Sequence, residues 1–322
     1  MSKDQKLVKV KRDTKSLVMK NLIVMAVLII IALTGVISWF TKKTEATADG
    51  INVKCEAPKG LKIAVVQHGD PAPSDDEYTD EDITLTKEDY PFLKEQSIIE
   101  ITSDGTDFYK PKLTQENGKA KPDTSSEWDV ADKDSYLSID VYMKTGDEHM
   151  VYLNSGTEIS PNSTTLTGEN SGNKSDDGNF SKDCIVGAVR LSTVNSTEST
   201  IKNLWIPAPQ IHYDSDNKEV TLGNTSGDTF KHMYWKVTKD SDGKTGKPQG
   251  TTPVEYDGVI TNTKNDFKLG KNYKFANLTK KKPTDKYATG MTTVNIWVDG
   301  EDDEARFAMV GGRFKATIKL SL

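Results

Sequence analysis

Histidine and carboxylate side chains are the groups in this 322-residue chain that could carry catalysis. The four histidines, His68, His149, His212 and His232, are scattered singly, and none has a second ligand at helical or hairpin spacing. The sequence contains no serine-hydrolase, zinc-protease, phosphate-loop or dinucleotide motif. No pair of carboxylates lies in a setting that would raise a pKa, which requires burial or a neighbouring like charge. The sequence therefore predicts a protein that is not an enzyme.

Two acidic stretches contain the oxygen ligands that calcium prefers. Asp240-Ser241-Asp242-Gly243 begins like a calcium-binding loop but lacks the bidentate glutamate that would follow, and residues 299–304 contain five carboxylates. The second stretch suits the N-terminus of a short helix equally well, because acidic side chains interact favourably with the helix dipole there. We therefore expect no cofactor, with calcium as the alternative.

Cys55 and Cys184 are the two cysteines of the chain, and no CxxC or Cys/His spacing indicates zinc. In an exported protein the two could form a disulfide with each other. Two buried thiols fit the same count, because free cysteine is among the most buried residue types. We favour the thiols and keep the disulfide as the alternative.

Aromatic side chains offer a binding chemistry of another kind, because their faces stack on sugar rings. Trp205, Trp235 and Trp297 lie in strand-like surroundings, where an aromatic residue usually packs in the core. Core packing is therefore the expectation for these tryptophans, and glycan binding is the alternative.

An apolar run near the N-terminus predicts export. Residues 22–40 contain no charge, and at about 1.5 Å per residue they can just cross a hydrocarbon core of roughly 30 Å. Residues 1–21 carry seven cations against two acids, a net charge of +5 that fixes the N-terminus in the cytoplasm. The net charge of −6 for the whole chain leaves −11 for the remainder, which is unsuited to nucleic acid or anionic lipid.

The apolar run fits either a permanent transmembrane anchor or a signal helix. Val36 and Ser38 suit the −3 and −1 positions of a signal-peptidase site with cleavage before Trp39, and residues 46–48 are a second candidate site. The predicted organisation is a basic cytoplasmic segment at 1–21, a transmembrane or signal helix at 22–40, a linker at 41–50 and an extracellular domain at 51–322. The protein is then either anchored in the cell membrane or released to the cell surface.

Short alternating segments between long polar loops predict an all-β extracellular domain, a β-sandwich or jelly roll. Ile51, Val53 and Cys55 alternate in a first strand, and residues 61–65 form a second strand or the other arm of a hairpin. Further strands are expected at 135–145, within 149–161, and at 184–194, 294–298 and 314–322, with Arg190 as an odd polar member of a buried segment. Residues 104–134 and 154–183 are expected to be loops, and residues 302–310 a short helix.

The segments "GVISWF" at residues 35–40 and "TEATADGINV" at residues 44–53 resemble the export region of the TasA and camelysin group. Those secreted Gram-positive proteins are matured by a SipW-type signal peptidase. In them, a Trp-Phe or Tyr-Phe pair lies just after the cleavage site. The segments "CIVGAVRLS", "NLWIPAP" and "VNIWVDGEDDEARFAMVGGRFKATIKL" also resemble recurrent pieces of uncharacterised membrane-anchored surface proteins of clostridia.

The resemblance to TasA implies a jelly-roll subunit that assembles with copies of itself into extracellular fibres of a biofilm matrix. In that assembly, an N-terminal strand freed by processing fills a groove in the next subunit, a form of β-augmentation. Residues 39–57, with Ile51, Val53 and Cys55, are the candidate donated strand, and the alternative is an ordinary first strand of the chain's own sandwich. The alternative function is a membrane-anchored extracellular module that binds a glycan or another surface protein.

Overall fold

The computed structural model describes most of the chain from residue 46 onward, with several gaps. The described residues are 46–47, 51–86, 88–94, 97–98, 100–116, 119–162, 182–207, 212–213, 219–220, 233–261, 267–300 and 312–322. These residues form strands, turns and a few short 3-10 helices, so the prediction of an all-β protein is confirmed. No helix among them is long and apolar enough to cross a membrane. The predicted membrane or signal segment, with Ser38 and Trp39, lies outside the described residues, as does the predicted helix at 302–310.

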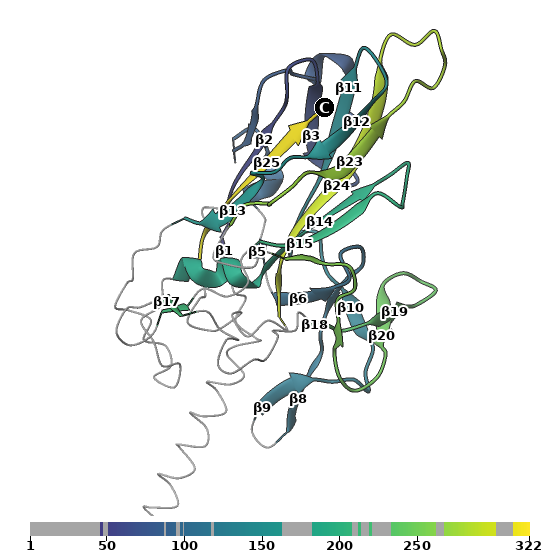
Figure 1. The fold of residues 1–322 in the computed structure, drawn as a ribbon. Helices are drawn as coiled ribbons and strands as arrows, with labels where there is room; N and C mark the ends of the chain where they lie inside the picture. Colours follow the sequence, from purple (N-terminus) through teal and green to yellow (C-terminus); the bar gives the residue numbers. More distant parts are fainter. Residues whose placement is uncertain are drawn as a thin grey trace, which may run out of the picture. The chain divides into compact units, whose positions relative to one another are not determined.

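The larger sheet has eleven strands and is centred on the longest of them, β24 (Figure 1). The strands, in spatial order, are β19 (Val237–Lys239), β20 (Thr245–Pro248), β10 (Trp128–Val130), β7 (Phe108–Lys110), β6 (Glu100–Ser103), β24 (Ala288–Asp299), β14 (Val189–Asn195), β15 (Lys202–Ile206) and β22 (Ile260–Thr261). β11 (Leu137–Thr145) also pairs with β24, and β3 (Lys62–Gln67) pairs with β11.

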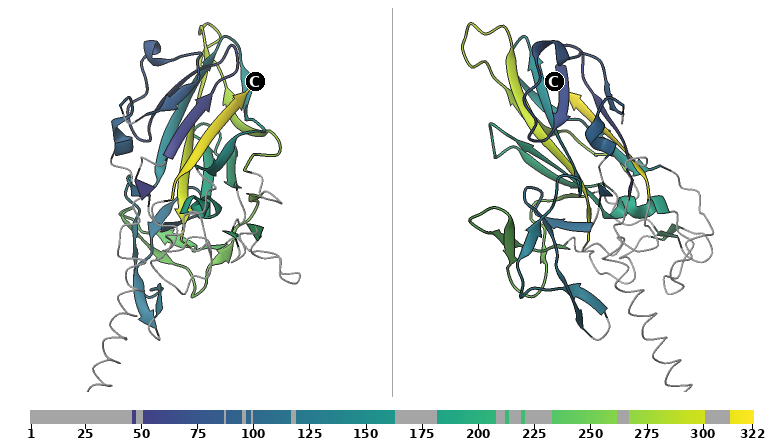
Figure 2. Two further views of the ribbon diagram at one scale, coloured as in Figure 1. Left: turned by 90° about the vertical axis from the view of Figure 1, so that its left-hand side faces the viewer. Right: turned by 180° about the vertical axis from the view of Figure 1, so that it is seen from behind.

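The smaller sheet has six strands and brings the two ends of the domain together. Its strands are β23 (Tyr273–Leu278), β12 (His149–Leu153), β25 (Phe314–Ser321), β2 (Ile51–Glu56) and β4 (Ile83–Leu85), with β13 (Glu158–Pro161) also on β25. β2 runs parallel to β25 and antiparallel to β4. The first long strand of the domain is therefore the neighbour of its last strand (Figure 2). β2 and β3 lie in different sheets, so they are successive strands rather than a hairpin.

The remaining elements are short. Two-stranded pairs are formed by β1 (Ala46–Thr47) with β5 (Ser97–Ile98), β16 (His212–Tyr213) with β17 (Glu219–Val220), β18 (Met233–Tyr234) with β21 (Val254–Glu255), and β8 (Leu113–Glu116) with β9 (Lys119–Pro122). The 3-10 helices are η2 (Asp75–Glu77), η3 (Pro91–Lys94) and η4 (Lys182–Ala188). The β8–β9 hairpin belongs to one compact unit, and all the other described elements belong to a second unit.

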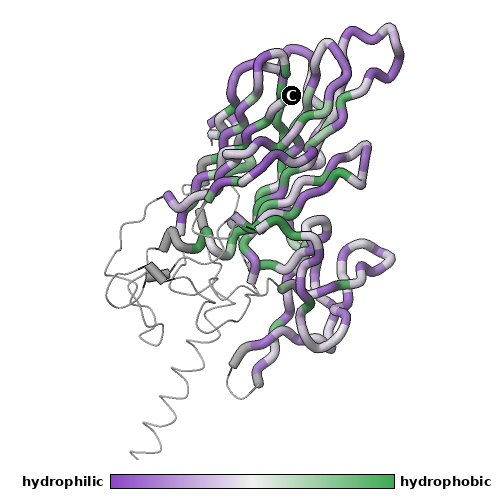
Figure 3. The backbone as a smooth tube through the Cα atoms, in the orientation of Figure 1, coloured by the Kyte–Doolittle hydropathy of each residue, from purple (hydrophilic) through white to green (hydrophobic). Residues whose placement is uncertain are grey.

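Side-chain alternation along the strands builds one hydrophobic core from both sheets. In a strand every second side chain points to the same face, and the core receives Leu137, Ile139, Val141 and Met143 from β11. The smaller sheet contributes Val53 and Cys55 from β2 and Phe314, Ala316 and Ile318 from β25 to the same cluster. Hydrophobic segments accordingly follow the central strands, and the connecting loops are hydrophilic (Figure 3). The alternation that predicted these strands thus also identified their buried faces.

Three predictions about local structure are wrong. The expected loop at 154–183 contains β13 (Glu158–Pro161). Residues 184–194 were expected to be one strand, but Cys184–Ala188 belong to η4 and only Val189 onward is strand. Ile185, Val186 and Ala188 are buried in an unbroken apolar run, which periodicity does not distinguish from a buried strand. Residues 104–134 were expected to be a loop, but they contain β7 to β10, which at three or four residues are too short to show alternation.

Candidate functional site: a groove between two sheet edges

β3 forms one edge of the larger sheet. In the described part of the chain it pairs only with β11, apart from an isolated bridge between Ile63 and Thr79. The Ile63 N–H donates to the Thr79 carbonyl at 2.8 Å, and the Thr79 N–H donates back at 2.9 Å. This bridge covers the edge at Ile63, and no described residue pairs with the edge of β3 beyond it.

The alternating hydrogen-bond pattern between β3 and β11 shows which backbone groups of β3 point away from β11. The His68 N–H donates to the Ser138 carbonyl at 3.0 Å. Because bonded and non-bonded pairs alternate along an antiparallel ladder, Val66 bonds to β11 and Val65 points the opposite way. The N–H and C=O of Val65 have no hydrogen-bond partner among the described residues. An edge of this kind is a template for pairing with another strand.

A groove of about 390 Å³ lies along this edge. One wall is residues 64–67 of β3, and the other lining residues include Ile83 of β4, Phe92 of η3 and Tyr90, which precedes η3. β4 is itself the edge of the smaller sheet, so the groove lies where the edges of the two sheets meet. Ile83, Tyr90 and Phe92 are partly buried and pack against the main core. The groove therefore combines an apolar lining with unpaired strand backbone.

The rim of the groove is acidic, with Asp70, Glu77 and Asp89 among its lining residues. Ser74 donates its hydroxyl to Glu77 Oε2 at 2.5 Å and its N–H to the same oxygen at 2.6 Å. These hydrogen bonds lower the pKa of Glu77. The Asp89 carboxylate accepts a hydrogen bond from the Thr86 hydroxyl at 2.8 Å. The groove thus offers fixed negative charge to whatever enters it.

The predicted donor strand is β2, and the described chain holds it on both sides. Val53 lies opposite Ala316 of β25 and Leu85 of β4, and its exposed fraction is 1%. Cys55 is a free, fully buried thiol, and burial raises its pKa to about 12. The side chain of Cys184 lies outside the described residues. β2 therefore completes its own smaller sheet, as expected of an ordinary first strand.

No protein-family model, curated protein or solved structure matches this chain. The resemblance of residues 35–53 to the TasA and camelysin group stays a prediction from the sequence. The features of this chain that bear on function are therefore those of its own structure, above all the groove along β3.

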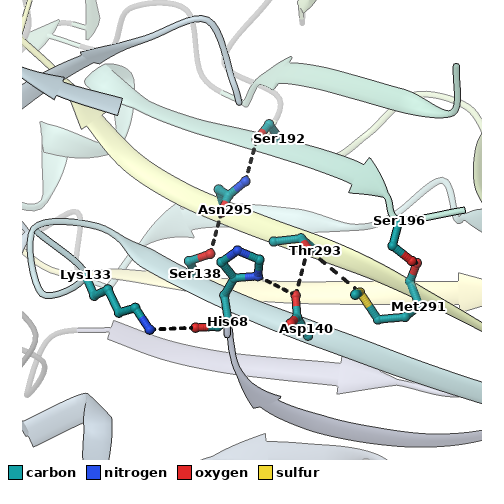
Figure 4. A network of polar contacts seen from close by, with 9 residues as sticks. All are labelled: His68, Lys133, Ser138, Asp140, Ser192, Ser196, Met291, Thr293 and Asn295. Carbon is teal, nitrogen blue, oxygen red and sulfur yellow. Dashed lines mark hydrogen bonds and ion pairs between the residues drawn. The ribbon is translucent and has the colours of Figure 1, made fainter. Parts of the chain in front are cut away.

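A polar network lies on the face of the larger sheet opposite to the core residues of β11 (Figure 4). The carboxylate of Asp140 is almost fully buried, and its Oδ1 lies 2.9 Å from His68 Nδ1 and accepts a hydrogen bond from the Thr293 hydroxyl at 2.7 Å. Across the same strands, Ser138 donates to Asn295 at 2.6 Å, and Asn295 donates to Ser192 at 3.1 Å. The sequence did not reveal this network, because its members come from four segments.

The pair His68–Asp140 has two of the three members of a hydrolytic triad. A triad also requires a nucleophile hydrogen-bonded to the second ring nitrogen of the histidine. Within the described ranges no hydroxyl or thiol bonds to that nitrogen of His68. The described geometry is that of a buried carboxylate hydrogen-bonded to a half-exposed histidine.

Replacing His68 with Gln should reduce stability in a pH-dependent way. The hydrogen bond to Asp140 raises the pKa of His68, although burial opposes the effect. Burial opposes ionisation of Asp140 as well, but the bonds from His68 and Thr293 lower its pKa. Because the folded pKa of His68 is raised, its contribution is fully present below the unfolded value of about 6.5 and is lost as pH rises through the folded pKa.

Urea unfolding of the native chain and His68→Gln across the pH range would measure this difference. It should be largest below about pH 6.5 and should shrink at higher pH. His149→Gln is the matched control, because His149 is an exposed histidine of the smaller sheet. A stability difference for His68→Gln that does not change with pH would contradict the prediction.

The tryptophans and aspartates singled out from the sequence lie in the core and in a hairpin tip. Trp205, Trp235 and Trp297 are buried, so the prediction of core packing is confirmed. Asp240 and Asp242 lie at the tip of the β19–β20 hairpin, where they accept hydrogen bonds from Thr245 and Lys244. Among the described residues, no group of three or more His, Cys, Asp or Glu side chains could hold a metal ion. Residues 301–304 lie outside them.

The sequence placed Asp299 in an acidic cluster considered for calcium, and the structure buries it completely. Asp299 Oδ2 lies 3.7 Å from Arg190 Nε and 2.8 Å from the Tyr256 hydroxyl. The available signal was Arg190, because a cation inside a buried strand requires a nearby anion. Sequence spacing did not indicate which carboxylate was its partner.

Proposed function

We propose that this protein is an exported cell-surface structural subunit that assembles into fibres, as in a biofilm matrix, by β-strand addition. The observation that carries the proposal is the groove between the edges of β3 and β4, with unpaired backbone at Val65 and an apolar lining. In β-augmentation the backbone hydrogen bonds supply affinity, and pockets for alternate side chains supply specificity. Two sheets that share one core support a β-sandwich of the jelly-roll type for the subunit.

We assign the donor role to residues 39–45, the part of the predicted donor range that precedes β1. β2 is already paired with β25 and β4. Residues 39–45 are therefore the part of the predicted donor range that can pair with another copy. Trp39 and Phe40 can fill the apolar groove, and Lys42 and Lys43 complement the charge of its acidic rim. Cleavage between Ser38 and Trp39 would release this segment from the membrane helix.

A truncation series tests the donor assignment. A chain that begins at Trp39 should form fibres visible by electron microscopy and sediment as large species. A chain that begins at Ala46 keeps every described strand and should remain monomeric. Exchange of β2 between copies is the competing arrangement, because a swapped β2 would make the same pairings with β25 and β4 of another chain. Fibres from the shorter chain would therefore overturn the role of residues 39–45 and favour exchange of β2.

The second candidate function is a membrane-anchored extracellular binding module for a glycan or a protein. This function requires that the protein keeps residues 22–40 as a membrane anchor. Residues 39–45 would then stay at the membrane. The acidic rim and free backbone of the groove would serve a peptide ligand in that case, by the same strand addition.

A further inference from the structure

A second cavity, of about 360 Å³, lies on the β14–β15 hairpin of the larger sheet. Its lining includes Ser192 of β14, Lys202 and Leu204 of β15, the loop 104–106, and Tyr234 with residues 256–258. These segments are widely separated in sequence. The cavity is distinct from the groove at β3, and the proposed strand addition does not use it.

Two stacked tyrosines form one side of this cavity. The ring centroids of Tyr234 and Tyr256 are 4.5 Å apart, and the ring planes are inclined by 16°. The Tyr256 hydroxyl lies 2.6 Å from the Ser103 carbonyl oxygen and 2.8 Å from Asp299 Oδ2, and it can donate to either. Tyr256 is buried and held in place, whereas Tyr234 is only half-buried. The cavity therefore has an aromatic wall with a rigid support.

The loop 104–106, which also lines the cavity, is fixed as well. Ser192 donates its hydroxyl to the Gly105 carbonyl at 2.6 Å. A Cβ at Gly105, whose φ is +90°, would come within 3.2 Å of Ser192 Cβ, so the loop backbone lies directly on β14. Asp104 Oδ1 accepts the N–H groups of Thr106 and Asp107, both at 2.9 Å. These bonds orient the Asp104 carboxylate and leave Oδ2 as an acceptor.

Charged groups of both signs surround the aromatic wall. Asp104 and Asp257 line the same cavity as Tyr234. Burial raises the pKa of Tyr234, and these two carboxylates raise it further. Within the described ranges Lys202 and Asp257 form no ion pair, so their ends are available to a ligand. The cavity thus offers both hydrogen-bond acceptors and an ammonium donor.

We infer that this cavity binds a saccharide, with one sugar ring packed on Tyr234 and its hydroxyls hydrogen-bonded to Asp104, Asp257 and Lys202. Sugar hydroxyls both donate and accept, so they suit a site that contains carboxylates and an ammonium group. The C–H face of a sugar ring packs on an aromatic face. Two carboxylates disfavour a phosphate, and Lys202 disfavours a cationic peptide. A cavity of this size falls within the usual range for small-ligand sites.

The inference does not depend on strand addition, and it gives the subunit a means of attaching to polysaccharide. It can be tested by calorimetric titration of the full-length protein with cellohexaose, maltohexaose and tetra-N-acetylchitotetraose. At least one of these saccharides should bind with a Kd below about 10 mM. Tyr234→Ala should weaken that binding by about tenfold or more, because the packing face is lost.

Two control variants make the result specific. Tyr234→Phe keeps the ring, and Tyr152→Ala removes a half-buried tyrosine of the smaller sheet; both should bind within about twofold of the native chain. Asp257→Asn, at an exposed residue, should weaken binding severalfold and gives a second test if Tyr234→Ala fails to fold. Absence of binding by all three saccharides, or native affinity in Tyr234→Ala, would overturn the inference. Binding of a lysine-rich peptide in the same cavity, with no saccharide bound, would overturn it as well.

Discussion

A chain with Val65→Pro should fold as a monomer and form no fibres. Proline removes the backbone N–H of Val65, which points away from β11 and has no partner among the described residues. Within the domain no hydrogen bond to β11 is lost, because the bonded positions of β3 alternate with Val65. An added strand, however, loses a hydrogen bond at the middle of the groove and meets the proline ring. Electron microscopy and analytical ultracentrifugation would measure assembly, and circular dichroism would confirm folding.

Val65→Ala is the matched control for this prediction. It removes the same buried side chain, at a cost of about 1–3 kcal/mol in stability, but keeps the N–H. Val65→Ala should therefore still assemble. If Val65→Pro fails to fold, Gln67→Pro offers a second test, because Gln67 has the same backbone phase and is less buried. Normal fibres from a folded Val65→Pro or Gln67→Pro chain would remove the β3 edge from the assembly mechanism.

Arg190→Leu should lower the free energy of unfolding by about 3–5 kcal/mol. Arg190 and Asp299 have exposed fractions of 1% and 0%, and Arg190 Nε lies 3.7 Å from the Asp299 carboxylate. The guanidinium also donates to the carbonyls of Gly187 and Val189, at 2.9 and 3.1 Å. Leucine would leave the buried carboxylate without its cation and two carbonyls without this donor. Urea unfolding monitored by tryptophan fluorescence would measure the loss.

The double variant Arg190→Leu/Asp299→Leu separates the loss of charge pairing from the loss of side-chain packing. Removing both charges leaves no unpaired ion in the interior, so the double variant should be more stable than Arg190→Leu alone. Tyr256 can still donate to the Ser103 carbonyl in that background. A double variant that is less stable than Arg190→Leu would show that the pair is not the main contribution of Arg190.

Much of the strand architecture could be predicted from local pattern. Residues 51–55, 135–145 and 314–320 alternate clearly, and their described apolar side chains lie in the core as expected. Leu322, which the same pattern placed on the core face, is exposed. The three buried tryptophans followed from the same reasoning. The very short strands between residues 104 and 134 and the 3-10 turn at residues 182–188 could not be predicted, because period and propensity are ambiguous over so few residues.

The sequence by itself determined the all-β class and the positions of the alternating strands, because these depend on composition and on neighbours along the chain. It also contains an apolar run at residues 22–40, whose role in export stays a prediction. Only the tertiary structure decided that β2 lies between β25 and β4 and that no other described strand covers the edge of β3 beyond Ile63. It also decided that Arg190 meets Asp299 and that Tyr234 stacks on Tyr256. The physical reason is that strand pairing and side-chain contact join residues far apart in sequence, and a single chain carries no local signal of its partners.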